Sequence, residues 1–357
     1  ASGSYGKATL TINGGNITIY TDDDGIHSDS NLIVNGGNII ISNSYEGIEG
    51  NIINFNDGVV VKTAETFVAG VKEYTCTCGY DYKGTFTVDK IKILSISNSY
   101  GQDSFMKMHE MCEAAGFTDI HIAVLYFAGC SLDTHMQKIN GTHENGYTLY
   151  RYTDEAGKWN TPTYNAYDTD ITEFLSSESD WDIITIQQGS SGSGKSSTFG
   201  ELDNVINFVR GKCPDSKIIW NMTWAYPKDS SYLSAYNGDP IYMYNCIVDC
   251  IDSQIMPRVE NGNLHSIVPV GTAVMNARTS SFEDDMHRDN THLTYEFGRY
   301  IAALTWFCHI TGQSPYDTAF ATQNTTLTTE QMNIVLESVY NALENPYEIT
   351  QSKYIAQ

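Results

Sequence analysis

Five short apolar runs in the last three quarters of the chain predict buried β-strands. They lie at 91–97, 120–127, 183–187, 217–223 and 266–270, and their hydrophobic positions do not alternate with polar ones. Strands covered on both faces of a parallel sheet have this pattern. Helical periodicity fills the chain between and after them, at 103–115, 202–210, 242–256, 294–310 and 329–343. The alternation predicts an α/β domain with a doubly wound parallel sheet over residues 90–346, followed by a tail at 347–357.

The first 63 residues follow a different pattern, because they repeat with a period of 22. Leu-Thr-Ile-Asn-Gly-Gly-Asn-Ile-Thr-Ile at 10–19 returns in similar form at 32–41, and a weaker copy follows at 54–61. Short β-branched runs with Asn-Gly turns at a fixed period predict a β-solenoid over residues 1–66, each repeat forming one coil. Hairpins closed by the Asn-Gly turns are the local alternative. The region resembles the carbohydrate-binding-like β-helical segments of secreted bacterial proteins.

Two further segments complete the division of the chain. Residues 67–89 are expected to form a short β connector between the two regions. Residues 147–161, which are rich in Thr and Tyr, are expected to form a hairpin inserted in the α/β domain.

Charge and composition narrow the class of partner. Lys and Arg total 20 against 43 Asp and Glu, so the net charge is −23. Such a chain repels phosphate backbones and anionic membrane surfaces, which argues against a nucleic-acid partner. No apolar run reaches the roughly 20 residues that a membrane span needs. The abundance of uncharged polar residues leads us to expect a secreted or cell-surface bacterial protein whose signal peptide is not part of this sequence; the sequence leaves its oligomeric state open.

Eight cysteines in 357 residues are too sparse for a disulfide scaffold. They do not form the CxxC…CxxC pattern of a zinc site, so most are expected to be small buried thiols. The sequence leaves open whether any of them form disulfides.

The candidate chemistry lies just after the strands, where ligands of open parallel sheets bind. Ser99 follows the first strand in Ser-Asn-Ser-Tyr-Gly, at the start of a helix, and Gly129 lies in the turn after the second. The third strand ends in two glutamines at 187–188, of which only one can face a site because adjacent strand residues point in opposite directions. Asp289 and His292 stand three residues apart near the C-terminus.

This order resembles the SGNH (GDSL-type) hydrolase superfamily over about residues 90–345. The resemblance implies a nucleophilic serine in the first block, oxyanion donors in the second and third, and an Asp-x-x-His pair in the last. This sequence departs from the family pattern in two places. At 97–99 Ser-Asn-Ser stands where the family has Gly-Asp-Ser, and at 187–189 Gln-Gln-Gly stands where it has Gly-x-Asn. Some acetylesterases of the superfamily carry Gln-Gly in the third block, which favours Gln188 over Gln187 as a donor.

The resemblance implies a serine esterase that removes acyl groups, most simply O-acetyl groups, from a carbohydrate. Ser99 would be the nucleophile, His292 the general base and Asp289 the residue that orients His292. The N–H groups of Ser99 and Gly129, with the side-chain amide of Gln188, would hold the oxyanion. This chemistry needs no metal and no organic cofactor. The glycan and the acylated position stay open, as does sugar binding by the solenoid.

Aromatic residues near the strand ends are candidates for stacking on a sugar ring. Trp224 and Tyr226 follow the fourth strand, and Tyr100 follows the candidate nucleophile.

Other interpretations compete with the esterase. Residues 189–196 fit the P-loop pattern G-x-x-x-x-G-K-[ST] after a strand, which would indicate nucleotide binding. A metal hydrolase could use His287, Asp289 and His292 with Asp284 or Asp285 nearby. Residues 97–101 resemble the nucleophile elbow G-x-S-x-G of α/β-hydrolases but have serine in place of its first glycine, which disfavours that fold. The non-catalytic alternative is a secreted glycan-binding protein.

Overall fold

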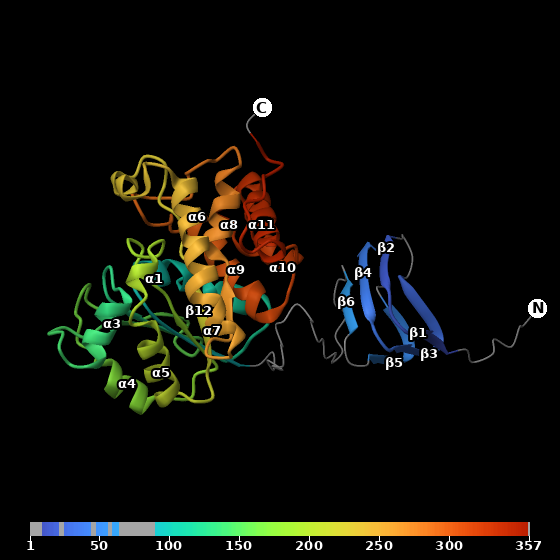
Figure 1. Ribbon diagram of the computed structural model, residues 1–357, viewed down its shortest axis with the longest axis horizontal. Coiled ribbons are helices and arrows are strands. Elements are labelled where there is room, and N and C mark those ends of the chain that lie inside the picture. The colour runs from blue at the N-terminus through green and yellow to red at the C-terminus, as the bar shows by residue number, and fades with distance from the viewer. Residues whose placement is uncertain (1–8, 21–24, 44–47, 56–58, 64–89, 356–357) are drawn as a thin grey trace, which may run out of the picture. The chain divides into compact units, whose positions relative to one another are not determined.

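The computed structural model describes residues 9–20, 25–43, 48–55, 59–63 and 90–355 (Figure 1). The chain divides into two compact units, residues 1–85 and 86–357, and each is described by itself. The predicted connector at 67–89 lies outside the described residues. No helix in the described ranges combines the length and the apolar composition that a membrane crossing requires.

The N-terminal unit contains two parallel three-stranded sheets. Strands β1 (Leu10–Ile12), β3 (Ile26–Val34) and β5 (Ile48–Phe55) form one, and β2 (Asn16–Tyr20), β4 (Gly37–Asn43) and β6 (Val59–Thr63) form the other. Leu10 pairs with Leu32 and Asn16 with Asn38, an offset of 22 residues that equals the sequence repeat. Parallel pairing at this offset is what the solenoid interpretation predicts, whereas hairpins pair antiparallel strands. The buried core consists of Ile26, Leu32, Val34, Ile39 and Ile41.

The C-terminal unit is built on a seven-stranded sheet in the order β10-β9-β8-β7-β11-β12-β13. Five strands are parallel and correspond to the five predicted runs: β7 (Ile91–Ser97), β8 (Ile120–Tyr126), β11 (Ile183–Ile186), β12 (Lys217–Asn221) and β13 (Ser266–Val268). Strands β9 (Thr148–Thr153) and β10 (Lys158–Trp159) form the predicted hairpin, which extends one edge of the sheet antiparallel. The predicted α/β class is therefore confirmed. The parallel strands have the spatial order 2-1-3-4-5, which places the topological switch point at β7.

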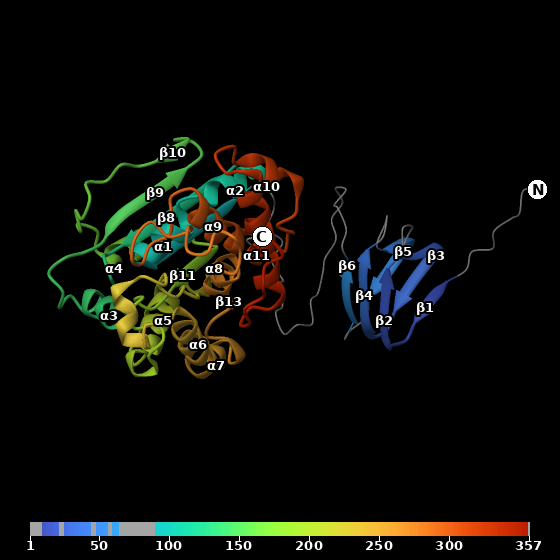
Figure 2. The same cartoon turned by 90° about the horizontal axis from the view of Figure 1, so that it is seen from above.

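Helices cover both faces of this sheet (Figure 2). One group packs around the C-terminal helices: α1 (Ser99–Phe105), α2 (Met108–Ala114), α8 (Val270–Arg278), α9 (Phe297–Thr311), α10 (Thr318–Gln323) and α11 (Thr329–Glu344). A second group comprises α3 (Leu132–Ile139), α4 (Ile171–Ser177) and α5 (Leu202–Lys212). The predicted helix at 242–256 is observed as α6 (Pro240–Cys250) and α7 (Met256–Glu260), joined by a π-helical turn at Ile251–Ile255.

The structure adds detail at two of the predicted boundaries. The helix expected at 103–115 begins at Ser99, because the side chain of Asn98 caps its first turn, and it is divided into α1 and α2 at Met106 and Lys107. The residues expected to form a tail are held in part by α8: the N–H of Thr350 donates to Asn276 Oδ1 (2.7 Å) and the N–H of Ser352 to Thr279 Oγ1 (2.8 Å).

Gly101 lets α1 lie directly against the strand that precedes it. A Cβ atom at this position would stand 2.0 Å from Ser97 Oγ and 2.3 Å from Ser97 Cβ. Both atoms belong to Ser97, a buried residue of the central strand β7, so they cannot move away without disturbing the packed core. The glycine therefore fixes the tight turn from β7 into α1.

We expect Gly101→Ala to lower the free energy of unfolding by about 1–3 kcal/mol through overpacking. Gly211→Ala is the matched control, because Gly211 is also helical but a Cβ there meets nothing within 4 Å; it should leave stability unchanged or raise it by up to about 1 kcal/mol. Urea unfolding curves of the three proteins test this. Equal curves for Gly101→Ala and the wild type would contradict the close-approach argument.

Candidate active site

Ser99 is placed by the turn that leads from β7 into α1. Asn98 precedes it in extended conformation, and its Oδ1 accepts a hydrogen bond from the N–H of Tyr100 (2.9 Å). Asn98 Nδ2 donates to the carbonyl of Cys130 (2.9 Å), which ties this turn to the one after β8. Ser99 is half-buried at the first position of the helix, at the carboxyl end of the switch-point strand.

His292 lies between Ser99 and Asp289. Its Nε2 is 2.8 Å from Ser99 Oγ, and its Nδ1 is 3.0 Å and 2.9 Å from the two carboxylate oxygens of Asp289. With the proton on Nδ1, the imidazole donates to the carboxylate and its Nε2 can accept the serine hydroxyl. The structure thus brings together the three residues that the sequence predicted as a triad, although Ser99 and His292 stand 193 positions apart.

The Asp289 carboxylate is held by its own loop. The N–H groups of Thr291 and His292 both donate to Asp289 Oδ1 at 2.8 Å. Partial burial raises the pKa of this carboxyl, but the hydrogen bonds from His292 and Thr291 outweigh that effect and lower the pKa to about 2. Asp289 is therefore ionised over the whole neutral range.

A second carboxylate, that of Asp103, fastens this loop to α1. Asp103 has no exposed surface and lies one helical turn after Ser99. It accepts hydrogen bonds from Arg288 Nη1 (2.9 Å), Arg299 Nε (2.8 Å) and the N–H of Leu293 (3.0 Å). Arg288 also donates to the carbonyl of Leu293. Because these contacts flank residues 289–292, they fix the distance between His292 and the helix that carries Ser99.

The three aromatic residues predicted to stack on a sugar are buried instead. Trp224 is 0% exposed, Tyr100 1% and Tyr226 3%, so that prediction is wrong. The rings of Tyr100 and Trp224 stack on each other with centroids 4.0 Å apart. Trp224 Nε1 donates to the carbonyl of Thr291 (2.9 Å), so it supports the loop of Asp289 and His292 from inside the protein.

The turns after β8 and β11 lie beside Ser99, and the first contains Gly129, the second predicted backbone donor. A Cβ at Gly189 would stand 3.2 Å from the carbonyl oxygen of Cys130, which shows how closely the two turns approach. Gly129 is exposed and has a φ of 64°. Within the described part of the chain, neither its N–H nor that of Ser99 is taken by a hydrogen bond.

The two glutamines point in opposite directions, as predicted, and the geometry contradicts the expected role of Gln188. Its Nε2 donates to the carbonyl (2.7 Å) and hydroxyl (3.1 Å) of Thr198, and its Oε1 accepts from the N–H groups of Leu132 and Gly189. The amide is fully used in holding the turns together and does not serve an oxyanion. Gln187 Nε2 donates to Asn98 Oδ1 (2.7 Å), beneath the serine.

The rival motifs find no support in the described residues. Residues 196–198 of the P-loop-like segment form a single 3-10 turn, and the next helix, α5, begins only at Leu202, so no helix N-terminus faces a phosphate there. Among all the residues that the structure describes, no group of three His, Cys, Asp or Glu residues is arranged to hold a metal ion. The side chain of His287 is buried, and this burial together with the nearby Arg278 lowers its pKa to about 3. The six cysteines of the described ranges are free thiols.

The fold and the site together define an α/β protein with a Ser-His-Asp arrangement at the carboxyl end of its sheet. Residues 92–342 match the family described as Domain of unknown function (DUF4886), so the chain belongs to that family. Residues 1–47 match the description "Carbohydrate-binding domain-containing protein". No curated protein matches the chain.

Solved structures similar to this chain include a member of the same family. The crystal structure of a DUF4886 family protein from Bacteroides uniformis is 28% identical, has a TM-score of 0.66, and aligns over 75% of this chain and 100% of its own. A candidate SGNH hydrolase from Slackia heliotrinireducens is 17% identical with a TM-score of 0.42, over 61% and 98% of the two chains. A GDSL-like lipase from Bacteroides thetaiotaomicron is 8% identical with a TM-score of 0.35, over 64% and 90%. The last two likenesses are too remote to bear on this site.

Sequence reasoning missed Asp103, whose contacts make it the anchor of the site. The only hint in the sequence was an acidic residue four positions, about one helical turn, after the candidate nucleophile. The support from Trp224 carried no such signal, because Thr291 is 67 positions away.

We expect Asp103→Asn to lower the free energy of unfolding by about 3–5 kcal/mol, because it leaves two half-buried guanidinium groups without their counter-charge. Asp203→Asn is the control: Asp203 also pairs with an arginine, Arg258, but its side chain is 56% exposed, and its loss should cost less than about 1 kcal/mol. Chemical denaturation measures both. Similar losses for the two variants would show that Asp103 is not a buried anchor.

The low pKa of Asp289 predicts an acid-dependent contribution to stability. The folded-state pKa of about 2 lies below the unfolded value of about 3.9, so the carboxylate stabilises the fold above roughly pH 4 and this contribution is lost as the pH falls through 2. The difference in urea midpoint between the wild type and Asp289→Asn should therefore shrink between pH 5 and pH 2. A difference that stays constant over this range would contradict the assignment.

Proposed function

We propose that this protein is an SGNH-type serine esterase that removes short acyl groups, in the simplest case O-acetyl groups, from carbohydrate. The observation that carries the proposal is the hydrogen-bonded series from Ser99 through His292 to Asp289. A serine at a helix start is commonly a structural residue. A serine whose hydroxyl lies 2.8 Å from an imidazole that is itself oriented by an ionised carboxylate has the geometry of an activated nucleophile.

The proposed reaction follows from the order of the hydrogen bonds in this series. Ser99 Oγ attacks the carbonyl carbon of the ester while its proton passes to His292 Nε2, and Asp289 stabilises the resulting imidazolium. The tetrahedral intermediate collapses when the C–O bond to the sugar breaks and His292 returns the proton to the departing sugar hydroxyl. Water then attacks the acyl-enzyme by the same route and releases the carboxylic acid together with free Ser99.

The N–H groups of Ser99 and Gly129 are the proposed oxyanion donors. Neither is used by another hydrogen bond in the described ranges, and the contact from Asn98 to Cys130 holds their two turns together. Because Gln188 is engaged elsewhere, we propose a site with two backbone donors. One such donor typically contributes about 10²–10³-fold in turnover.

Two observations support a short acyl group on a sugar. The stacked rings of Tyr100 and Trp224 are buried next to the triad, since Tyr100 follows Ser99 and its ring centroid lies 6.1 Å from that of His292; this packing favours a small acyl group over a long chain. The N-terminal residues match a carbohydrate-binding description, which favours a glycan as the rest of the substrate and a site of action outside the cell.

We expect wild-type protein to release acetate from an aryl acetate and from acetylated xylan, and Ser99→Ala to lose about 10³-fold or more of that activity. Ser191→Ala is the control, since Ser191 is exposed, belongs to a loop and has no place in the proposed site; it should retain wild-type rates. Labelling with a fluorophosphonate, mapped by mass spectrometry, should modify Ser99 alone.

Equal rates for wild type and Ser99→Ala would refute the nucleophile assignment. Absence of both activity and labelling in the wild type, with retained binding to polysaccharide, would favour a non-catalytic glycan-binding protein instead.

A further inference from the structure

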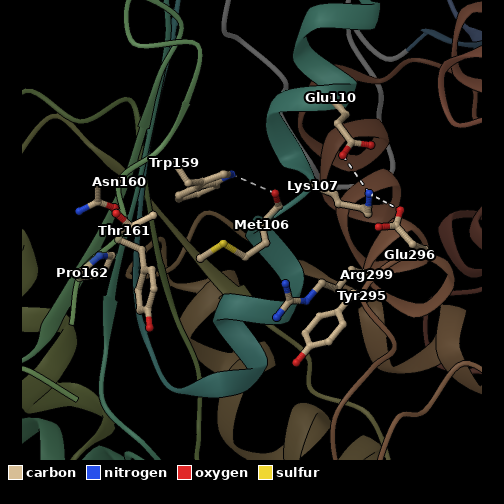
Figure 3. A pocket seen from close by; sticks show the side chains of 11 residues that line it. Met106, Lys107, Glu110, Trp159, Asn160, Thr161, Pro162, Tyr295, Glu296 and Arg299 are labelled. Carbon is tan, nitrogen blue, oxygen red and sulfur yellow. Dashed lines mark hydrogen bonds and ion pairs between the residues drawn. The ribbon is translucent and has the colours of Figure 1, made fainter. Parts of the chain in front are cut away.

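A pocket of about 500 Å³ opens at the far end of α1 from Ser99. Figure 3 shows Trp159 from the β9–β10 hairpin on one side of it, and on the other Arg299 of α9 and Tyr295, which precedes that helix. Its volume falls within the range of small-molecule binding sites. Neither the triad nor the proposed oxyanion donors use it.

The pocket is physically joined to the candidate triad. Helix α1 begins with Ser99 and ends one residue before Met106, which lines the pocket, a distance of about 10 Å along the helix. Asp103 binds Arg299 of the pocket and Arg288 of the triad loop at the same time. The ring of Tyr295 lies 4.7 Å from both guanidinium groups. A ligand in the pocket would therefore be held at a fixed distance from Ser99.

Two aromatic residues of the pocket, Trp159 and Tyr295, offer ring surface to a ligand. Trp159 Nε1 donates to the carbonyl of Met106 (3.1 Å), which fixes the indole plane (Figure 3). Tyr295 is 60% exposed, so the part of its ring that does not contact Arg288 and Arg299 is available to a ligand. A sugar ring, with apolar C–H faces and a polar hydroxyl edge, is complementary to such surfaces when polar groups stand beside them.

The charges beside these rings balance each other. Lys107 lies between Glu110 (2.9 Å) and Glu296 (2.7 Å), and Arg299 is paired with Asp103. Among the described residues no hydrogen bond occupies the Nη groups of Arg299, which leaves donors for hydroxyl oxygens. An aliphatic chain would desolvate four charged lining residues without replacing their hydrogen bonds, and a polyanion would meet a chain of net charge −23.

We propose that this pocket is the carbohydrate subsite of the protein and binds a neutral sugar ring of an oligosaccharide whose acylated residue lies at Ser99. Trp159 and Tyr295 contact the C–H faces, and Arg299 and Lys107 contact the hydroxyl groups. This rests on the proposed esterase function for the role of Ser99, but binding by the pocket does not require catalysis.

Binding is therefore measured first, by isothermal titration of full-length Ser99→Ala with xylotetraose, cellotetraose and mannotetraose. We expect at least one to bind, and Trp159→Ala or Tyr295→Ala in the same background to weaken it about tenfold. Tyr242→Ala, which removes an exposed tyrosine of α6 outside the pocket, should bind as the parent does. Trp159→Phe should recover part of the affinity, which separates loss of the ring from misfolding.

Kinetics on the catalytic protein provide the second readout. The ratio of kcat/KM for the acetylated tetrasaccharide to that for an aryl acetate should fall about tenfold in Trp159→Ala, mainly through KM. If the wild type hydrolyses neither ester but Trp159→Ala still weakens oligosaccharide binding, the esterase assignment fails and the subsite stands. If none of the neutral oligosaccharides binds, if only oligogalacturonate or a fatty acid binds, or if Trp159→Ala and Tyr295→Ala bind like Tyr242→Ala, the subsite proposal is overturned.

Discussion

The buried carboxylate of Asp103 is the contact on which the rest of the site depends. It lies in α1, one turn after Ser99, and binds two arginines and a backbone N–H on either side of His292. A buried charge is stable only when it is paired and fully hydrogen-bonded, so this carboxylate admits one arrangement of its partners. That arrangement fixes the loop of residues 289–292 against α1, the helix that follows β7, although Arg288 and Asp103 are 185 positions apart in the sequence.

A series of buried amides gives the opposite side of Ser99 the same rigidity. Asn98 Oδ1 accepts from Gln187, Gln187 Oε1 accepts from Asn221, and Asn221 Oδ1 accepts from the indole of Trp306. These residues end three adjacent parallel strands or pack against them, so polar groups cross the core without being left unpaired. Glutamine at 187 is thus explained by the strand ends it connects.

The sequence allowed the local parts of this arrangement to be predicted. Apolar runs located the parallel strands, and the three-residue spacing of Asp289 and His292 made their contact predictable because one loop supplies both groups. The burial of Trp224 and the engagement of Gln188 were not predictable, because each depends on a segment far along the chain that covers or binds it. The sequence around an aromatic residue that follows a strand is the same whether a distant loop covers that residue or leaves it open to a ligand. For the same reason the pocket at Trp159, which is formed by three segments spread over residues 106–299, left no pattern in the sequence.

Two carboxylates divide the demands of stability and chemistry between them. Asp103 is fully buried and neutralised by arginines, which suits a structural anchor but leaves it unable to respond to a neighbouring imidazole. The side chain of Asp289 is 47% exposed, and two backbone N–H groups in its own loop keep it ionised. Its charge can therefore balance an imidazolium on His292 without the cost of burying an unpaired anion in the ground state. Asp289 can remain exposed because Asp103 already holds the loop in place, so the loop does not have to be packed into the core.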